Sequence, residues 1–373
     1  MTRKRTHPRQ RKGYVFSDPL LDYAKGYARL EKATQNSMEL SGELDVASFL
    51  FPTRTVPVED RPGYVTYERD YFSIDYPDAS VKKDLERYFA AEHSIFRHDL
   101  FGSHGGLGGF FESIAKQLLI VGESFYWMDW DEVDIGENKY QLPLSFDYVN
   151  AGTTKAVKKA GVVDSYVQKY SLFTYWRERQ IGLGSMFKDY MDNVKPRTVN
   201  FSKDEIFHCV YPFAKKTPTA ASMKFLPTVR AFWQFGLNQG KGNNELDNYY
   251  LPIERARHTT YAAEKRKYDI ARAKIRTAYN YLIDPNGPQI TEYYDLFVAV
   301  RFKKFLNDFR DYLVREFNSE VLERVKVKNN LADTPQLKYS GFVTNQEIDN
   351  AFRAYESGAL SLEEFTEAVI KKP

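Results

Sequence analysis

Apolar and polar residues alternate most regularly between positions 105 and 130, in the segment GGLGGFFESIAKQLLIVGESFYWMDW. Apolar side chains recur there every three or four residues, which places them on one face of a helix. They are Phe110, Phe111, Ile114, Leu118, Leu119 and Val121. Gly122 stands where a left-handed glycine ends a helix, and the aromatic residues 125–127 favour a strand. The segment predicts a helix, a glycine stop and a strand, without a catalytic group.

The chain before this segment predicts helices on both sides of an extended region. Asp18 and Pro19 can cap a helix over residues 20–34, whereas residues 41–80 carry the prolines, glycines and spaced aromatics of short strands and turns. A second helix is expected over residues 81–98. Its apolar stripe consists of Val81, Leu85, Tyr88, Phe89 and Phe96.

Residues 123–210 are expected to be mainly β. One pair of strands surrounds the Gly-Glu-Asn turn at 136–138, and a second pair is expected within residues 161–176. Residues 198–210 predict a turn followed by a strand with Ile206, His208 and Val210 on one side. The alternating pattern of residues 123–210 differs from the three- and four-residue spacing of apolar side chains in the segments after it.

The remainder of the chain predicts helices. They are expected over residues 223–239 (with Phe225, Val229, Phe232 and Trp233 on one face), 252–283 and 290–327, with a loop over residues 325–336. Thr344 with Glu347 and Ser361 with Glu364 fit capping boxes, and Gly358 fits a helix stop between them. A C-terminal helical hairpin is therefore expected.

Composition narrows the class of protein. The 373 residues carry a net charge of +3, and no apolar run approaches the roughly 20 residues of a membrane span. No secretory signal sequence is visible, and Cys209 is the single cysteine, so an internal disulfide is excluded and a reducing compartment is allowed. Because the net charge is small, any nucleic-acid contact must come from local patches.

Two such patches exist. The first is a basic arm over residues 1–13, with Arg3, Lys4, Arg5, Arg9, Arg11 and Lys12. It is either a solvated tail, a phosphate-contacting arm or a contact to an acidic neighbouring subunit. The second is the helix over residues 252–283, with Arg255, Arg257, Lys265, Arg266, Lys267, Arg272, Lys274 and Arg276. It is either a solvated helix or the wall of a channel that meets DNA backbones.

No pattern of residues indicates a catalytic, cofactor or metal site. The glycine-rich segment GSHGGLGG precedes a helix but lacks the lysine and spacing of a phosphate loop. Four acids lie at a strand end beside a glycine turn, where they form either a solvated cluster or a cation site: Asp129, Asp131, Glu132 and Asp134. His208 and Cys209 are adjacent on a strand, so they should point to opposite faces. The chain is therefore expected not to be an enzyme.

Several segments, in this order, resemble the portal (head-to-tail connector) proteins of tailed bacteriophages. FFESIAKQLLIVGESFYWMDW is similar to the helix-glycine-strand of the family's wing lobe, and FSKDEIFHCVYP to its strand with Asp204, Glu205, Ile206 and His208. RFKKFLNDFRDYLVREFNSEVLERV resembles the long crown-side helix, and TNQEIDNAFRAYESGALSLEEFTEAVI the terminal helical region. The chain is short for this family and shows no obvious clip sequence.

The resemblance implies an α+β protomer in four parts: the basic arm 1–13, a wing lobe over 14–222, stem and clip over 223–291, and a long helix with a helical crown over 292–373. The tunnel loop would be residues 284–291 or 326–340. It also implies a ring, dodecameric in that family, through which double-stranded DNA passes without sequence specificity. Its partners would be the terminase large subunit, a head-tail adaptor and the major capsid protein.

The resemblance further implies a virion protein at the capsid portal vertex, assembled in the host cytoplasm and without a membrane contact. Two other functions stay open at the level of sequence. One is a DNA-binding replication or processing protein whose acids, such as Asp129 and Asp131, hold a metal. The other is a different component of the head-tail connection.

Overall fold

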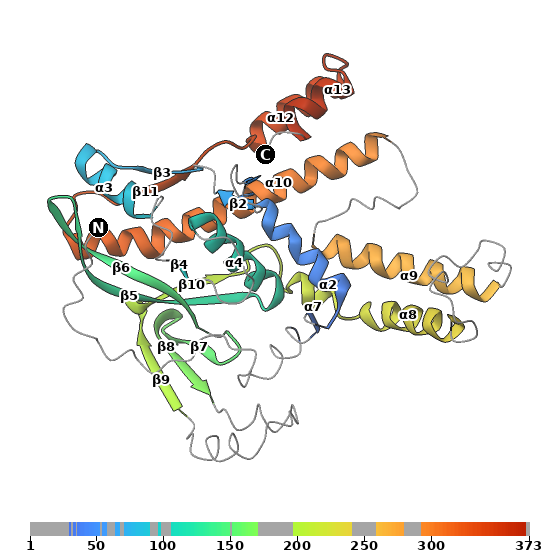
Figure 1. The fold of residues 1–373 in the computed structure, drawn as a ribbon, viewed down its shortest axis with the longest axis horizontal. Helices are drawn as coiled ribbons and strands as arrows, with labels where there is room; N and C mark the ends of the chain where they lie inside the picture. The colour runs from blue at the N-terminus through green and yellow to red at the C-terminus, as the bar shows by residue number, and fades with distance from the viewer. Residues whose placement is uncertain are drawn as a thin grey trace.

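The computed structural model describes residues 30, 33–34, 36–52, 54–57, 64–67, 71–89, 96–97, 106–149, 151–170, 197–240, 259–279 and 292–370. Helices and strands are mixed along the chain (Figure 1). None of the described helices is long and apolar enough to cross a membrane. The predicted division of the chain into four parts stays a prediction. The largest buried core includes residues from both sides of the expected boundary at 222, from Ala33 to Leu337.

Helix α4 (Leu107–Ile120) and the strand after it lie at the centre of this core. Gly122 ends the helix with φ +90°, and a Cβ there would stand 2.9 Å from the Thr217 side chain. The helix, stop and strand predicted from the sequence are confirmed. The expectation of one apolar face was too narrow, because twelve of the fourteen helix residues are buried. Contacts with a neighbouring sheet, with α7 (Pro218–Ser222) and with the 3₁₀ turn η1 (Leu44–Phe49) cover α4 on several sides.

The sheet beside α4 has the order β10-β5-β6-β4. Strands β5 (Glu123–Ile135) and β6 (Asn138–Val149) form the predicted hairpin, with Gly136 at φ +63° in its turn. The strand β10 (Ile206–Val210) runs antiparallel to β5, and β4 (Phe96–Arg97) runs parallel to β6. Phe110 packs its ring against those of Tyr126 and Phe146, at 4.8 and 5.0 Å between centroids, which joins α4 to this sheet.

A second sheet consists of β7 (Thr154–Lys159), β8 (Val162–Tyr170) and β9 (Arg197–Ser202), all antiparallel. The expected pair within 161–176 was displaced: β8 pairs instead with β7, which precedes it, through a turn at Ala160 and Gly161, and residues 171–176 lie outside the described chain. The turn η3 (Lys203–Glu205) then leads into β10, as the sequence predicted.

The N-terminal part corrects two expectations. Residues 41–49 were expected to be extended but belong to α2 (Met38–Glu43) and the 3₁₀ turn η1 (Leu44–Phe49), because the Ser37 side chain caps α2 by accepting from the Leu40 amide. Helix α3 (Ala79–Phe89) ends before Phe96, which lies in β4 instead of on the helical stripe. Residues 54–75 do contain short strands, as expected. They are β1 (Arg54–Pro57), β2 (Tyr64–Tyr67) and β3 (Phe72–Asp75).

The long helix predicted over 290–327 is confirmed but is interrupted. Helix α10 (Glu292–Phe317) continues through the π-helical turn η6 (Asn318–Leu322) into α11 (Glu323–Asn329), so the loop expected from 325 begins only at Asn330. Strand β11 (Gln336–Tyr339) follows and pairs with β3. The Asn318 amide accepts from the Leu337 N–H (2.7 Å) and donates to its carbonyl (3.1 Å), which joins the π turn to this strand. Phe297, in the first turns of α10, is 46% exposed.

The next three helices of the described chain follow β10, and the second and third of them extend to the right in Figure 1. They are α7 (Pro218–Ser222), α8 (Leu226–Gly240) and α9 (Thr259–Ala278), and Pro227 lies in the first turn of α8, where proline is tolerated. The C-terminal hairpin is α12 (Asn345–Glu356), α13 (Leu362–Phe365) and the π turn η7 (Thr366–Ile370). Both predicted capping boxes form, and Gly358 has φ +75°.

Candidate subunit and nucleic-acid interface

The helices α8 and α9 pack against each other through aromatic and aliphatic side chains. The rings of Phe232 and Tyr268 stack at 4.6 Å with an interplanar angle of 22°. At the base of the pair, the Tyr279 hydroxyl lies 2.5 Å from the Thr219 hydroxyl in a buried contact between the end of α9 and α7. This end of the pair is therefore anchored in the core. Trp233, expected on the buried face of α8, is instead 46% exposed.

The basic residues predicted for the helix over 252–283 and for the N-terminal arm differ in their surroundings. Lys265 and Lys267 are exposed and pair with neighbouring acids of the same helix, Asp269 (3.4 Å) and Glu264 (2.7 Å). Arg266 and Lys274 are exposed, and Arg272 is half-buried. Arg255, Arg257 and the arm residues Arg3, Lys4, Arg5, Arg9, Arg11 and Lys12 lie outside the described residues. Among the described residues of α9, Arg266 and Lys274 are thus the exposed cations that do not pair with an acid of the helix.

Arg276 has a different role from the one predicted. Its side chain is buried, and its Nε donates to Glu43 Oε1 of α2 at 3.2 Å. A buried ion pair that joins two helices is not available to DNA, so Arg276 must be removed from the candidate phosphate contacts. The sequence could not indicate this because its partner lies 233 residues away.

Glu43 is the unusual member of this pair. Its second carboxylate oxygen, Oε2, is buried without a hydrogen-bond partner in the described structure. Burial raises the pKa of Glu43 to about 7, although Arg276 and Arg272 act in the opposite direction. The cost of removing the Glu43 carboxylate from water is therefore larger than its attraction to the two arginines, as is common for buried ion pairs.

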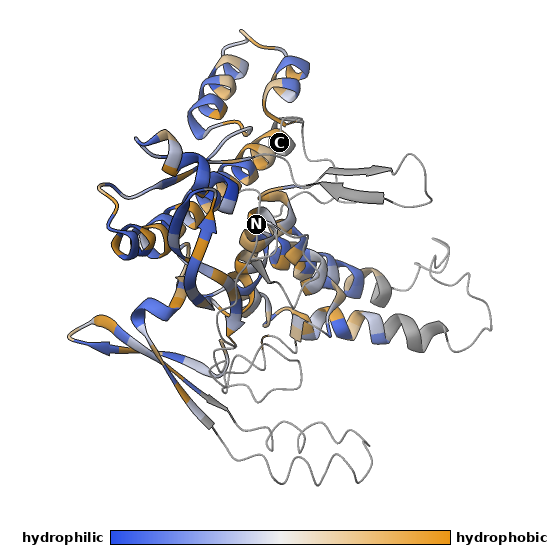
Figure 2. Ribbon diagram, turned by 60° about the vertical axis from the view of Figure 1, so that its left-hand side comes forward, coloured by the Kyte–Doolittle hydropathy of each residue, from blue (hydrophilic) through white to orange (hydrophobic). Residues whose placement is uncertain are grey.

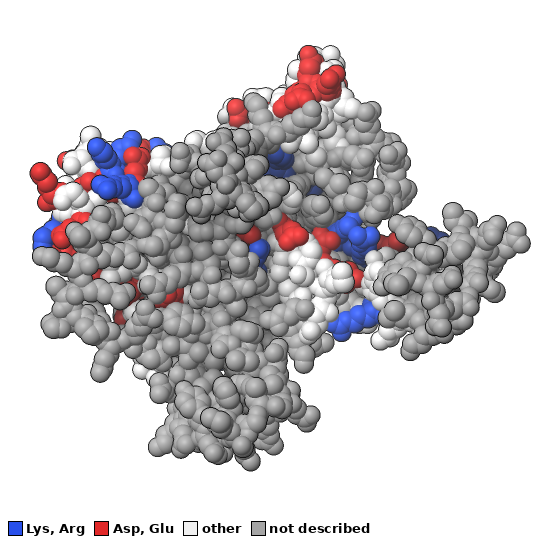
Figure 3. Space-filling view, in the orientation of Figure 1, with Lys and Arg blue, Asp and Glu red and all other residues white. Residues whose placement is uncertain are grey.

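Glu43 also lines a cleft of about 700 Å³ between α2–η1 and the α8–α9 pair. Met38, Phe49 and Trp233 give it apolar walls, and Glu39, Asp45 and Arg272 give it charged ones. The Trp233 indole N–H donates to Glu39 at 2.8 Å across the cleft. Figure 3 shows acidic and basic side chains side by side in this region of the surface. The cleft suits an amphipathic protein segment better than a polyanion.

The acidic cluster beside the β5–β6 turn is engaged in surface contacts. Lys139 lies 2.7 Å from Glu132 and 3.9 Å from Asp134, and the hydrogen bond to Glu132 raises the pKa of Lys139. Asp131 accepts from the amide of the next residue at 2.9 Å. No group of three or more potential metal ligands occurs among the described residues. These contacts favour the solvated cluster over a cation site.

His208 and Cys209 lie on opposite faces of β10, as strand geometry predicted. The His208 ring stacks on Phe125 at 4.3 Å and lies 3.5 Å from the Tyr166 hydroxyl. The Cys209 thiol is buried, and burial raises its pKa well above the ordinary value. A thiol held in its neutral form is a poor nucleophile, so both residues serve packing.

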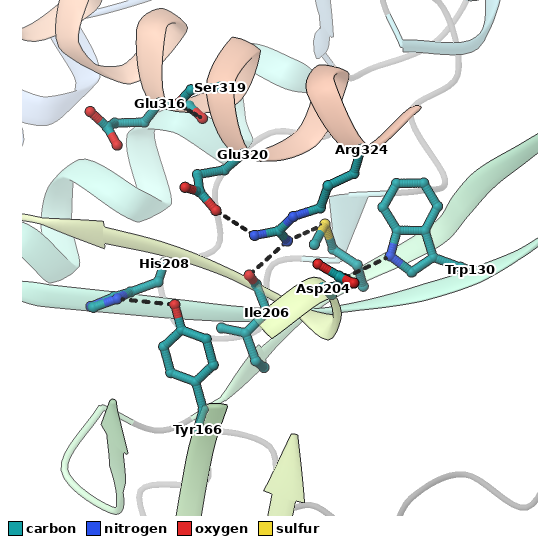
Figure 4. A network of polar contacts seen from close by, with 10 residues as sticks. Trp130, Tyr166, Asp204, Ile206, His208, Glu316, Ser319, Glu320 and Arg324 are labelled. Carbon is teal, nitrogen blue, oxygen red and sulfur yellow. Dashed lines mark hydrogen bonds and ion pairs between the residues drawn. The ribbon is translucent and has the colours of Figure 1, made fainter. Parts of the chain in front are cut away.

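Two buried arginines of the long helix were missed by the sequence reasoning. Arg324 donates to the Ile206 carbonyl at 2.8 Å and bonds to Glu320, so the π turn and α11 are fixed to β10 (Figure 4). Arg310 donates to the carbonyls of Leu50 (2.6 Å) and Phe49 (2.9 Å). No local pattern could have shown that they are buried, since each arginine also donates to a carbonyl more than a hundred residues away in the sequence.

No protein-family model and no curated protein matches this chain. Solved structures do match. A chain described as "Neck of native GTA particle computed with C12 symmetry" has a TM-score of 0.52 at 12% identity, with 95% of both chains covered. A second chain, described as "Neck of empty GTA particle computed with C6 symmetry", has a TM-score of 0.50 at 13% identity. The match covers 95% of this chain and 96% of that chain.

A third match is "Virion of native gene transfer agent (GTA) particle", with a TM-score of 0.50, 13% identity, and 93% of this chain and 94% of that chain covered. At such low identities the likeness concerns the fold alone. The chain therefore shares its fold, over nearly its whole length, with chains of gene transfer agent particles.

Proposed function

We propose that this chain is a structural subunit of a phage-like head-to-tail connection, and that it forms a ring of the portal type. The observation that carries the proposal is the fold match over 95% of both chains to a particle neck computed with C12 symmetry. A match of this extent includes both the sheets and the long helices of the chain. The sequence resemblance to portal proteins supports the same assignment independently.

In this proposal α4 and its sheet form the rigid outer wall of each subunit, and α8 with α9 form the stem. Double-stranded DNA passes through the ring during packaging and ejection. Weak, sequence-independent contacts suit such passage, because tight phosphate binding would retain the DNA. Weak contact agrees with the pairing of two exposed α9 cations, Lys265 and Lys267, with acids of the same helix.

The proposal assigns no catalysis and no cofactor to the chain. Nucleotide hydrolysis would belong to the terminase large subunit, which docks on the ring during packaging and is replaced by a head-tail adaptor. The major capsid protein would surround the ring at the portal vertex of the virion, after assembly in the host cytoplasm. Closed rotational symmetry lets one chain build the whole ring from a repeated contact.

The test is the oligomeric state and shape of the purified full-length chain. Mass photometry and negative-stain imaging should show rings with a central channel, with a mass of about 520 kDa for twelve copies of the 43.4 kDa chain. A monomer at every concentration, together with nuclease activity that depends on divalent cations, would contradict the proposal and favour a nucleic-acid-processing protein. Rings without an open channel would indicate a different head-tail component.

A further inference from the structure

Exposed apolar side chains gather at the cleft between α2–η1 and α8–α9. Met38 is 89% exposed, Trp233 46% and Phe49 45%, and all three line the cleft. Exposed aromatic and methionine side chains around a concave surface are typical of protein interfaces, where such residues are enriched. A protein segment that docks in the cleft would cover these side chains.

The charges of the cleft restrict its occupant. Asp45 is an exposed acid on the rim, and the buried Oε2 of Glu43 has no hydrogen-bond partner within the described structure. Glu39 adds a third acid to the same wall, against the two cations Arg272 and Arg276. An occupant that combines small apolar side chains with ammonium groups would match both the walls and the acids.

The tip of the β7–β8 hairpin has this combination. Val157 and Val162 are exposed apolar residues of its two strands, at 36% and 63%. Lys158 and Lys159 lie between them in the sequence, and both are exposed. Of these two, Lys159 is engaged with Asp164 at 2.8 Å. The narrow turn at Ala160 and Gly161 makes the tip slender.

The hairpin and the cleft lie on different sides of one molecule. Figure 2 shows the β7–β8 tip extending on the side of the body away from the α8–α9 pair. A hairpin placed in this way cannot fill the cleft of its own chain. Two different complementary surfaces on separate sides of a protomer are what a head-to-tail contact in a ring requires.

We infer that the β7–β8 hairpin tip of one copy docks in the cleft between α2–η1 and α8–α9 of the next copy. This inference rests on the proposed ring. Val162 would then cover the apolar wall formed by Met38 and Trp233, and Lys158 would face Asp45. The contact would be repeated around the ring and would place the second sheet of each copy against the helices of its neighbour.

Cysteine cross-linking tests the contact directly in the full-length chain. The double variant Met38→Cys with Val162→Cys should form, on mild oxidation, a ladder of covalent oligomers that a reductant reverses. The matched control is Val327→Cys with Val162→Cys, since Val327 is 67% exposed but lies on α11. Each single variant should stay uncross-linked, because the native Cys209 thiol is buried.

A charge exchange tests the same contact without cross-linking. Asp45→Lys and Lys158→Asp should each raise the concentration of half-maximal ring assembly by about tenfold, because like charges then face each other. The combined variant should return to within about threefold of the unmodified chain. Because neither residue is buried, all variants should fold, which circular dichroism would verify.

The outcomes separate this inference from the proposed function. Rings that form normally without cross-linking of Met38→Cys to Val162→Cys, or with no rescue by the charge exchange, would overturn the hairpin contact and leave the ring intact. Cross-linking in the Val327→Cys control to the same extent would also overturn it. Absence of any ring for the unmodified chain would overturn both.

Discussion

The guanidinium of Arg310 lies over the ring of Phe342, with its central carbon 3.8 Å from the ring centroid. The same group donates to the carbonyls of Leu50 and Phe49 and to the side chain of Asn307. One residue of α10 therefore joins the segment after α2–η1 to the segment before α12. Burial lowers the pKa of Arg310 to about 10, which reflects the cost of this position.

Replacement of Arg310 should test how much this joint contributes to stability. Arg310→Ala leaves the buried Leu50 carbonyl, the part-buried Phe49 carbonyl and the Asn307 amide oxygen without this donor, and we expect a loss of about 2–4 kcal/mol in the free energy of unfolding. Arg310→Lys should recover less than half of the loss, since an ammonium cannot donate in the fork geometry of a guanidinium. Urea denaturation measures both. The control Arg315→Lys, on an exposed side chain, should change stability by less than about 0.5 kcal/mol.

Glu43 predicts a pH dependence of stability. Its folded-state pKa is about 7 against an ordinary value of 4.5, so between these pH values the folded chain binds a proton that the unfolded chain has released. The contribution of Glu43 to stability therefore falls as the pH rises from about 4.5 to 7. Glu43→Gln should match the unmodified chain near pH 5 and be relatively more stable at pH 8.

Thermal denaturation across this pH range would measure the effect. In Glu43→Gln the new amide oxygen keeps an acceptor for Arg276, so the comparison isolates ionisation. Glu137→Gln, at an exposed acid in the distant β5–β6 turn, is the control and should leave the slope unchanged. Equal slopes for the unmodified chain and Glu43→Gln would show that Glu43 ionises normally.

Leu118 tests the burial of α4. Its side chain is fully buried, so Leu118→Asp would place an unpaired carboxylate in the core and should cost at least about 4 kcal/mol, enough to prevent folding. Leu118→Met keeps an apolar side chain of similar volume and should cost less than about 1.5 kcal/mol. Soluble yield and circular dichroism distinguish them. A folded Leu118→Asp protein would refute the central position of α4.

The cations of α9 predict a difference between exposed and buried positions in DNA contact. Replacement of Arg266 and Lys274 by glutamine should reduce the slope of log affinity against log salt by about two, since each backbone-contacting cation contributes about 0.9. The control pair, Lys139→Gln with Lys338→Gln, removes two exposed lysines of distant strands that each pair with an acid.

Filter binding of a short duplex at several salt concentrations measures these slopes. Arg276→Gln should act through stability instead, because it leaves the buried Glu43 without its partner. An equal reduction by the control pair would mean that α9 is not a preferred contact. Identical losses with duplexes of unrelated sequence are expected, since no base is read.

Local sequence was sufficient for most individual elements. The α4 helix with Gly122, the β5–β6 hairpin and both C-terminal capping boxes were predicted, because periodicity, left-handed glycines and side-chain caps act within a few residues. The wrong predictions at positions 41–49 and at Phe96 also came from local sequence, which was misleading there. Spaced aromatics there suggested strands or a longer helix, and the Ser37 cap was not recognised.

The candidate site was predicted only in part. Arg266 and Lys274 are exposed as expected, whereas Arg276 is buried against a residue 233 positions earlier. The cleft beside it was not foreseen, because Met38, Phe49 and Trp233 come together only when α2–η1 packs near α8 and α9. A surface assembled from separate segments has no signature within any one of them.

The sequence by itself determined the order of most helices and strands, many of the positions at which they end, and the absence of an internal disulfide. Tertiary structure decided that β3 pairs with β11, that α4 is enclosed on several sides, and that Arg310 and Arg324 serve as internal ties. The physical reason is the separation in sequence over which each kind of interaction acts. Helix periods, turns and caps depend on neighbours in sequence, whereas burial and the partner of a buried charge depend on how distant segments pack.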